Sequence, residues 1–246
     1  MGSLHLLQVT DTHLFVDQSA SKNGISPASN LNAILDKALA RRTPDILVAT
    51  GDIAQEPVRE TYERFLGAVH ARYSGNLLVI PGNHDSGELM REIFPVCSCT
   101  LGSWTVVCLD THIDGEVAGH VTQQNIDQLE ADLLAAERHV VVIGHHPIVD
   151  VGAKWLDAHR VDNGGQVISI LKQHAKGSKT YLCGHIHQEF DGTIEGVRCL
   201  ATPSTCWQFA RDVEQFALDS APPGWRWLTL FDDGTIQTEV VRLGTA

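Results

Sequence analysis

The sequence predicts an α/β protein in which two mixed β-sheets pack together as a sandwich with helices outside. Three observations predict this fold class: short apolar runs suited to buried strands, amphipathic stretches between them, and a change to β-type patterning after about residue 184. The 246 residues are 43% hydrophobic and 20% charged, which is an ordinary globular composition. Their number fits one large domain covering residues 1–246.

Six short apolar runs are typical of buried strands. They occupy residues 4–10, 45–50, 76–81, 104–110, 139–144 and 179–184. Between these runs, apolar residues recur at helical spacing in four stretches, at residues 31–39, 58–69, 126–134 and 167–171. Pro44 would end the first helix, Pro57 suits the first turn of the second, and Thr122 suits the N-cap of the third. Alternating strands and helices predict parallel strand pairing.

The pattern changes in the last quarter of the chain. Residues with β-branched or aromatic side chains are frequent in three stretches there, at residues 197–203, 225–231 and 235–243. A turn signal, Asp232-Asp233-Gly234, separates the last two, and no helical pattern lies between them. We therefore expect a mainly antiparallel β segment from about residue 185 to residue 246.

The charge and the N-terminal sequence argue against several classes of protein. Eighteen Lys and Arg against 30 Asp and Glu give a net charge of −12, which disfavours binding to long nucleic acid. The first ten residues lack the features of an export signal, and no apolar run approaches the ~18 residues of a membrane span. We expect a soluble, cytoplasmic protein whose six cysteines are free thiols. Cys97 and Cys99 are too closely spaced for a zinc ribbon.

Polar residues that can bind metals follow five of the six predicted strands. They are Asp11 and His13, Asp52, Asn83, His145, and His185 and His187. In four of the five places a glycine directly precedes the donor, which lets the backbone turn sharply or approach a bound group closely. The carboxyl ends of strands in α/β sheets face the ligand crevice, so residues far apart in sequence can converge there.

Seven such donors are too many for one tetrahedral metal ion, which needs about four ligands. Two octahedral ions that share one carboxylate and one solvent oxygen would use all of them. Oxygen and imidazole donors without a thiolate suit Fe, Mn, Zn or Co, and the amide of Asn83 favours a harder ion. The alternative is a set of turn formers and hydrogen-bonded core histidines, but clustered carboxylates and imidazoles without a cation would be poorly compensated. The sequence therefore predicts a dimetal centre.

The order of these donors resembles the signature of the calcineurin-like metallophosphoesterases, which is D-x-H, GD, GNH[DE], H and GHxH. In this chain it reads Asp11-Thr12-His13, Gly51-Asp52, Gly82-Asn83-His84-Asp85, His145 and Gly184-His185-Ile186-His187. The segments LLQVTDTHLF, VATGDIAQ, LCGHIHQE, LATPSTC and APPGWR extend the resemblance along the whole chain to the bacterial class III 3′,5′-cyclic AMP phosphodiesterases. The resemblance implies the α/β/β/α sandwich of that superfamily.

Position by position, the resemblance also implies how the donors divide between two ions. One set comprises Asp11, His13, Asp52 and His187, and the other comprises Asp52, Asn83, His145 and His185. Asp52 would then bridge the two ions. The metals of the family are usually Fe and Mn, with Zn or others such as Co in some members, and several members are homodimers.

We therefore expect hydrolysis of 3′,5′-cyclic AMP to 5′-AMP with solvent as the nucleophile. Two ions about 3.5–4 Å apart would acidify a bridging water to hydroxide near neutral pH and neutralise the phosphoryl oxygens. The ribose 3′-oxygen needs a proton as it leaves, and His84 is the candidate general acid because it adjoins the ligand Asn83 without being a ligand. A phosphate contact without proton transfer is the alternative for His84. Asp85 would stabilise the charged His84 ring.

Asn83, His84 and His146 are the expected substrate contacts, although His146 suits a structural hydrogen bond equally well. Trp207 and Phe209 could stack on a purine or pack in the core, and His112 and His120 lie in a glycine-containing loop that contacts either substrate or solvent. Five further histidines have no motif around them: His5, His70, His139, His159 and His174.

Two other functions remain open at the level of sequence. The first is another phosphoester hydrolase, acting on a 2′,3′-cyclic nucleotide, a glycerophosphodiester or a phosphomonoester; the acidic composition argues against a nuclease. The second is a non-catalytic scaffold of the same fold. A scaffold predicts missing donors, whereas the set in this chain is complete.

Overall fold

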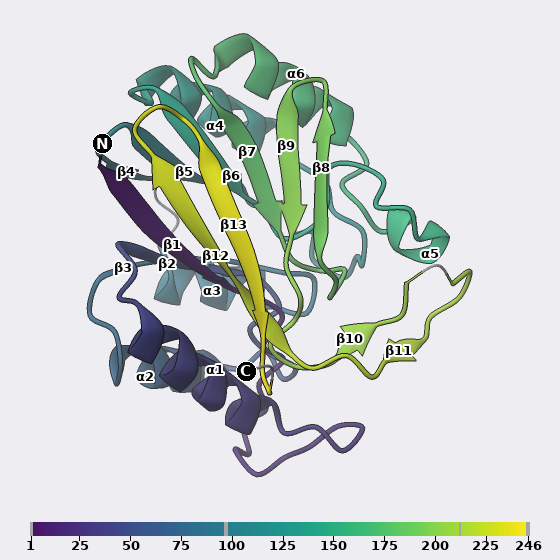
Figure 1. The fold of residues 1–246 in the computed structure, drawn as a ribbon. Helices are drawn as coiled ribbons and strands as arrows, with labels where there is room; N and C mark the ends of the chain where they lie inside the picture. The colour runs from purple at the N-terminus through teal and green to yellow at the C-terminus, as the bar shows by residue number, and fades with distance from the viewer. Residues whose placement is uncertain (1, 96–97, 212, 245–246) are drawn as a thin grey trace.

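The structure is a computed structural model that describes residues 2–95, 98–211 and 213–244. Two large mixed sheets face each other, and helices cover both outer surfaces (Figure 1). The predicted fold class is therefore confirmed.

Cys97 lies outside the described residues, and Cys183, Cys199 and Cys206 are buried free thiols. Among the described residues, no helix combines the length and the apolar character needed to cross a bilayer.

The first sheet has five strands in the order β13-β12-β1-β2-β3. Strands β1, β2 and β3 run parallel, whereas β12 pairs antiparallel with both β1 and β13. Along β1, Leu7 and Val9 pack under the helices and Leu6 packs against the other sheet, because successive side chains alternate in direction. The bounds are β1 Ser3–Val9, β2 Ile46–Thr50, β3 Asn76–Ile80, β12 Gly224–Phe231 and β13 Ile236–Arg242.

The second sheet has six strands in the order β4-β5-β6-β7-β9-β8. Its four inner strands run parallel, and β4 and β8 pair antiparallel at the two edges. Every residue of β5 and β6 is buried, because one face of the sheet meets helices and the other meets the first sheet. The bounds are β4 Cys99–Leu101, β5 Trp104–Cys108, β6 His139–Ile143, β7 Lys179–Cys183, β8 Phe190–Ile194 and β9 Val197–Ala201.

The helices divide between the two sheets (Figure 1). The first sheet is covered by α1 (Pro27–Arg41), α2 (Arg59–His70) and α3 (Gly87–Ile93), and the second by α4 (Gln123–Ala135) and α6 (Gly164–His174). A third apolar cluster, which includes Val48 and Leu182, fills the space between the sheets. The predicted cap of α4 is confirmed, because the Thr122 hydroxyl accepts the backbone N–H of Asn125 at 3.3 Å.

Outside the two large sheets, α5 (Lys154–Asp157) and a hairpin of β10 (Gln208–Phe209) and β11 (Leu218–Asp219) project from one side of the molecule (Figure 1). The sequence patterns do not predict these elements, nor α3, β4 and β8. All of them are short, and β8 buries none of its five residues completely, so periodicity gives little signal.

The C-terminal segment contains one parallel pairing, that of β9 with β7, beside its antiparallel pairings. It divides between the two sheets, because β8 and β9 join the second sheet while β12 and β13 join the first. One detail of the sequence prediction needs correction, which is the position of Pro57. Pro57 precedes the N-cap residue Val58 of α2 and therefore lies just outside the first helical turn.

Candidate dimetal site

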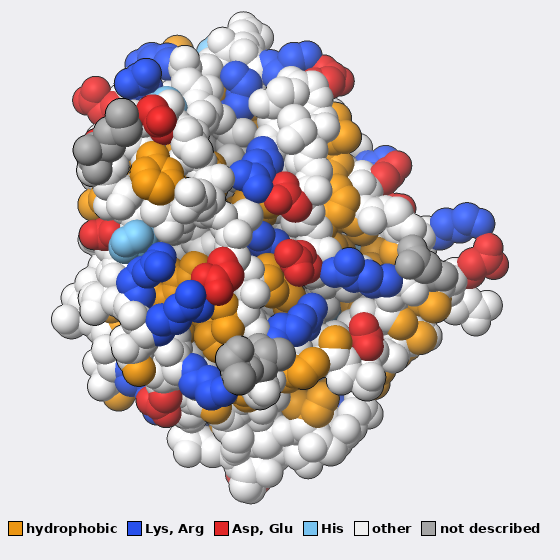
Figure 2. Space-filling view, viewed as in Figure 1, with side chains coloured by type: hydrophobic (Ala, Val, Ile, Leu, Met, Phe, Trp, Pro, Cys, Tyr) orange, Lys and Arg blue, Asp and Glu red, His pale blue; other side chains and the backbone are white. Residues whose placement is uncertain are grey.

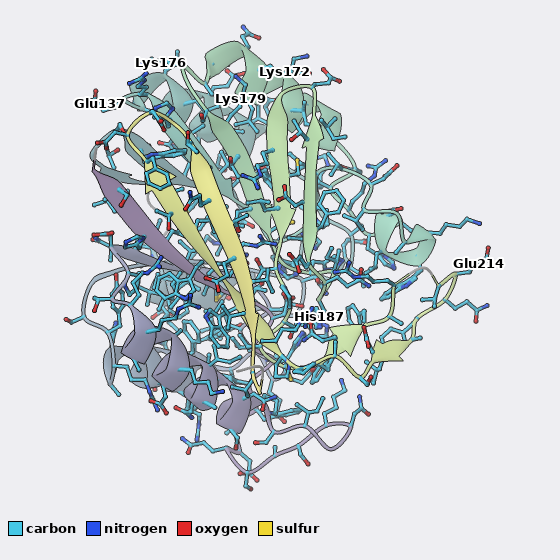
Figure 3. All side chains as sticks on the ribbon, in the orientation of Figure 1. Glu137, Lys172, Lys176, Lys179, His187 and Glu214 are labelled. Atoms are coloured by element: carbon cyan, nitrogen blue, oxygen red, sulfur yellow. The ribbon has the colours of Figure 1, made fainter. Side chains whose placement is uncertain are left out.

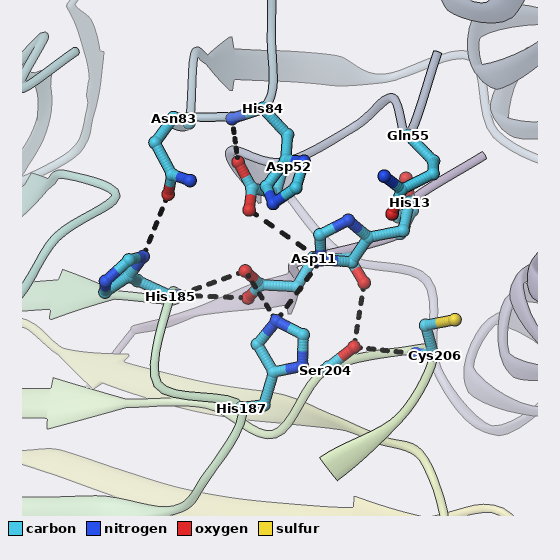
Figure 4. A network of polar contacts seen from close by, with 12 residues as sticks. Asp11, His13, Asp52, Gln55, Asn83, His84, His185, His187, Ser204 and Cys206 are labelled. Carbon is cyan, nitrogen blue, oxygen red and sulfur yellow. Dashed lines mark hydrogen bonds and ion pairs between the residues drawn. The ribbon is translucent and has the colours of Figure 1, made fainter. Parts of the chain in front are cut away.

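The seven predicted donors come together where strands of the two sheets end. Figure 4 labels all of them except His145. Asp11 and His13 follow β1, Asp52 follows β2 and Asn83 follows β3, whereas His145, His185 and His187 follow strands β6 and β7 of the second sheet. The backbone N–H of His185 donates to both carboxylate oxygens of Asp11 at 3.1 Å, so the site joins the two sheets. The prediction that these strand ends converge is confirmed.

The backbone at this site is unusual. Five of the seven donors have positive φ angles between 46° and 65°, in the left-handed region that non-glycine residues rarely adopt. They are Asp11, His13, Asp52, His185 and His187. Such conformations cost about 1–3 kcal/mol each and cluster at functional sites. Local strain therefore marks the same residues as the sequence motifs do.

The first group of donors is Asp11, His13 and His187, whose ligand atoms lie within 4.8 Å of one another. Nε2 of His187 is 3.3 Å from Oδ1 of Asp11 and 3.3 Å from Nε2 of His13. Nε2 of His13 is also 3.7 Å from Oδ2 of Asp52. All four residues are buried, so the group is shielded from solvent.

The second group contains Asp52, Asn83, His145 and His185. Nε2 of His145 is 3.4 Å from Oδ1 of Asp52 and 3.2 Å from Oδ1 of Asn83. The same amide oxygen is 3.0 Å from Nδ1 of His185. Asp52 thus faces the first group with one carboxylate oxygen and the second group with the other. This is the arrangement expected of a bridging ligand.

Backbone carbonyls orient two of the imidazoles. Nδ1 of His145 lies 2.7 Å from the carbonyl oxygen of Thr50, and Nδ1 of His187 lies 2.7 Å from that of Trp207. A carbonyl can only accept, so Nδ1 carries the proton in both rings and Nε2 is directed to the other donors. These contacts left no signal in the sequence, because any residue supplies a carbonyl.

The donor set fits cations. Oδ1 of Asp52, Oδ1 of Asn83 and Nε2 of His145 lie close together, and such acceptor atoms need a proton or a metal ion between them. Burial acts to lower the pKa of His145, but the charges of Asp52 and Asp11 outweigh burial and raise it. Burial and neighbouring imidazoles hold the pKa of His13 and of His185 well below the ordinary value, so both rings stay neutral, as metal ligands must be.

At two positions of this site, only glycine leaves enough room for the neighbouring side chains, as the sequence predicts. A Cβ atom at Gly82 would collide with the carboxylate of Asp52, and one at Gly184 would collide with the hydroxyl of Thr10 and lie 2.6 Å from Oδ2 of Asp11. Neither glycine has a positive φ angle. Close approach of the backbone to the buried carboxylates is therefore what requires glycine at these positions.

His84 stands at the open side of the site. Its side chain is exposed, its backbone N–H donates to Oδ1 of Asp52 at 2.9 Å, and its ring meets that of His13 edge to face at 5.0 Å. Asp85 is placed differently from the expectation. Its carboxylate accepts the backbone N–H groups of Ile53, Ala54 and Gly82 at 2.9–3.1 Å, and no bond to the His84 ring is present among the described residues.

Asp85 holds two loops together through its hydrogen bonds. Burial and the charge of Asp52 raise its pKa to about 7, although the three backbone N–H groups oppose this shift. These bonds connect the loop after β2 with the loop after β3, which carry Asp52 and Asn83. The interpretation of Asp85 as a partner of the His84 ring therefore needs correction to a positioning role.

His146 does not line the cavity above the donors. Its ring is buried, with Nδ1 2.8 Å from the Thr111 hydroxyl and Nε2 3.2 Å from the Val117 carbonyl oxygen. The structural hydrogen bond, rather than the substrate contact, is what the structure shows. His112 and His120 also lie outside the cavity lining, and each contacts a carboxylate, that of Asp114 and that of Asp162 respectively.

A cavity of about 270 Å³ opens above the donors. Asn83 and His84 line it, together with residues that the sequence patterns do not single out: Lys22, Gln55, Trp155, His159 and Phe216. Trp207 and Phe209 also line the cavity and pack on donor rings, Trp207 on His13 at 4.7 Å and Phe209 on His187 at 4.1 Å. These residues come from distant loops, so their convergence depends on tertiary structure.

Comparisons with known proteins support the geometry. The chain is 36% identical to a protein of Escherichia coli (strain K12) named 3′,5′-cyclic adenosine monophosphate phosphodiesterase CpdA, over 98% of this chain and 90% of that one. It is 34% identical to a protein of the same name from Vibrio vulnificus (strain CMCP6), over 99% of this chain and 92% of that one. Among solved structures, a dimetal phosphatase from Danio rerio shares the fold, with a TM-score of 0.68, 13% identity, and 97% and 98% of the two chains covered.

The family model described as calcineurin-like phosphoesterase matches residues 4–189. This range contains every one of the seven donors and, apart from the first residue of β1, all of the strands that carry them. The match agrees with the donor geometry and with the near full-length similarity to the bacterial relatives. On these findings, the chain belongs to the calcineurin-like phosphoesterase family.

Proposed function

We propose that this protein hydrolyses 3′,5′-cyclic AMP to 5′-AMP at the dimetal site. The observation that carries the proposal is the position of Asp52, whose two oxygens face the two donor groups at 3.7 and 3.4 Å. Similarity to relatives named as cyclic AMP phosphodiesterases over nearly the whole chain supports the choice of substrate.

We infer that Asp11, His13, Asp52 and His187 hold one ion and that Asp52, Asn83, His145 and His185 hold the other. When bound, two such ions supply positive charge at the phosphoryl oxygens and a nucleophile drawn from water at neutral pH. Donors without thiolate suit Fe, Mn, Zn or Co, and we propose Fe and Mn because the resemblance to the metallophosphoesterases implies these two metals. Thr50 and Trp207 keep the imidazoles in the correct tautomer, and Asp85 keeps the Asp52 and Asn83 loops together.

His84 has the position required of a proton donor. Water attacks phosphorus, the bond from phosphorus to the ribose 3′-oxygen breaks, and that oxygen needs a proton as it leaves. The His84 ring lines the cavity, whereas its backbone N–H is fixed on the bridging Asp52. The imidazole therefore lies beside the donors, and with His13 and Asp52 it also forms a group whose ligand atoms lie within 4.8 Å of one another. We propose that His84 donates a proton and does not bind an ion.

The cavity and the charge distribution favour a small substrate. The cavity volume of about 270 Å³ lies just below the roughly 300–1,000 Å³ of pockets for drug-sized ligands, so the cavity favours one small ligand. Lys172, Lys176 and Lys179 lie at the opposite end of the molecule from His187 (Figure 3), so they form no basic track toward the site. With a net charge of −12, the protein is poorly suited to long nucleic acid.

We further propose that residues 1–246 act as one cytoplasmic domain that forms a homodimer.

A substrate panel tests the proposed reaction. Metal-stripped protein is reloaded separately with Fe and with Mn and assayed on 3′,5′-cyclic AMP, 2′,3′-cyclic AMP, a phosphomonoester and single-stranded DNA. We expect the highest kcat/KM with 3′,5′-cyclic AMP, 5′-AMP as the sole product and loss of turnover with a chelator. A clear preference for any other member of the panel would overturn the assignment of substrate.

A further inference from the structure

One wall of the cavity is aromatic and takes no part in the chemistry described above. Trp155 of α5, Phe209 of β10 and Phe216, which lies just before β11, form this aromatic wall. Each ring meets the other two edge to face, with centroids 5.2–5.6 Å apart and interplanar angles of 69–80°. Phe209 also stacks on the ring of His187 at 4.1 Å and 14°. The aromatic wall therefore reaches from the metal donors to the mouth of the cavity.

The mouth of the cavity exposes apolar surface. Phe216 is 61% exposed, Val117 50% and Leu218 41%, and all three line the cavity. Only three other large apolar side chains are exposed to this degree in the described part of the chain. Hydrophobic side chains gather along the protruding hairpin in the space-filling view (Figure 2). Apolar surface collected around a cavity is typical of a ligand site.

The hairpin that carries the aromatic wall is anchored to the dimetal site. Nε2 of Gln188, the residue after the donor His187, donates to the carbonyl oxygens of Phe209 and Ala210 at 3.0 Å each. At the outer end, Lys154 of α5 pairs with Glu214 at 2.9 Å. His187 lies at the inner end of the hairpin and Glu214 at its outer end (Figure 3). The Gln188 bonds therefore hold Phe209, the inner ring of the aromatic wall, next to the donor His187.

The cavity also has polar lining residues at its floor and at one side. Lys22 and Gln55 line it, and the floor is formed by the metal donors. Nζ of Lys22 lies 5.2 Å from the ring centroid of Trp207, next to the donor His13. A ligand that fits both surfaces has an anionic group at one end and a flat, weakly polar ring at the other. A nucleotide has this shape, with the phosphate at the floor and the base at the aromatic wall.

We propose that the aromatic wall binds the nucleobase of the substrate and that Trp155 and Phe216 determine the preference for a purine. This inference rests on the proposed function, because it takes the substrate to be a cyclic nucleotide. A purine presents a larger face than a pyrimidine to aromatic side chains and therefore gains more from stacking. Trp155 and Phe216 are thus specificity-determining residues, separate from the metal donors and from His84.

The test compares two substrates that differ only in the base: 3′,5′-cyclic AMP and the 3′,5′-cyclic phosphate of methyl riboside, which has no base. In Phe216→Ala we expect the ratio of kcat/KM for cyclic AMP to that for the abasic substrate to fall about fivefold or more, the lower limit for loss of one base–aromatic contact. The change should lie mainly in KM. Trp155→Ala should act in the same direction, and Phe216→Tyr should retain the ratio.

Equilibrium binding gives a readout independent of turnover. We expect Phe216→Ala to weaken binding of 5′-AMP, measured by titration calorimetry, and to leave ribose 5-phosphate less affected. Leu134→Ala is the matched control, since Leu134 is 59% exposed on α4 and does not line the cavity. Equal losses on the two substrates would overturn the inference. A wild-type enzyme without activity on cyclic AMP would instead overturn the proposed function, so the two failures are distinguishable.

Discussion

Asp52 lies between two groups of donors, each of which takes residues from both sheets, and its backbone has a positive φ angle. The donors could be predicted from the sequence because each follows a strand and belongs to a short motif. The carbonyls of Thr50 and Trp207 could not, because a backbone group has no sequence signature. The partners of Asp85 could not be predicted for a related reason. Its carboxylate does not bind the ring of its sequence neighbour His84 but accepts backbone N–H groups of another loop.

The role of His84 can be tested by changing the leaving group. His84→Ala should slow hydrolysis of cyclic AMP by about 10²–10⁴-fold, because the ribose oxygen then departs without a donated proton. A 4-nitrophenyl phosphodiester has an acidic leaving group that needs no proton, so it should lose far less. His70→Ala, an exposed histidine on α2, serves as the control. Equal losses on both substrates would contradict proton donation and favour a phosphate contact.

At the scale of secondary structure, strands buried on both faces were predictable and short edge elements were not. Strands β2, β5 and β6 are buried at every position and mostly apolar, which gives a nearly continuous signal in sequence. The β10–β11 hairpin has two residues in each strand, and its aromatic residues meet Trp155 of α5 from more than fifty positions away. The aromatic wall forms from residues that lie far apart in sequence, so it could be recognised only in the structure.

The loop that follows β7 depends on the absence of a side chain at Gly184. Gly184→Ala should place a Cβ against Thr10 and Asp11, displace the Asp11 carboxylate, and weaken metal binding by roughly 10- to 100-fold. Competition with a chelating dye measures the affinity, and circular dichroism checks the fold. Gly165→Ala in α6 is the control, because a Cβ there has open space and favours the helix. Unchanged metal affinity in Gly184→Ala would show that metal binding does not depend on the close packing of this loop against Asp11.

For the whole molecule, the dimetal site is one of the places where the two sheets are joined. The Asp11 carboxylate after β1 accepts the N–H of His185 after β7, and the donors from both sheets surround Asp52. An apolar cluster fills the rest of the space between the sheets. The sandwich as a class was predictable from alternating strands and helices, whereas the parallel insertion of β9 beside β7 depends on tertiary pairing.

Metal binding should therefore stabilise the complete fold. Each ion that binds only the native state at about 100 times its Kd adds roughly 2.7 kcal/mol, so two ions add roughly 5.4 kcal/mol, which raises the Tm of a protein of this size by about 10–20 °C. We expect chelator-treated protein to melt lower than Mn-loaded protein by this amount in differential scanning calorimetry. The difference should shrink in Asp52→Asn. A Tm that does not respond to metal in the wild-type protein would contradict a native-state ion site built by both sheets.

The shared position of Asp52 is tested most directly by crystallography of metal-loaded protein. An anomalous-difference map collected at the absorption edge of the bound metal locates each ion independently of the protein coordinates. The account predicts two peaks per chain, about 3.5–4 Å apart, with one oxygen of Asp52 directed to each. A single peak, or two peaks with Asp52 contacting only one of them, would contradict it.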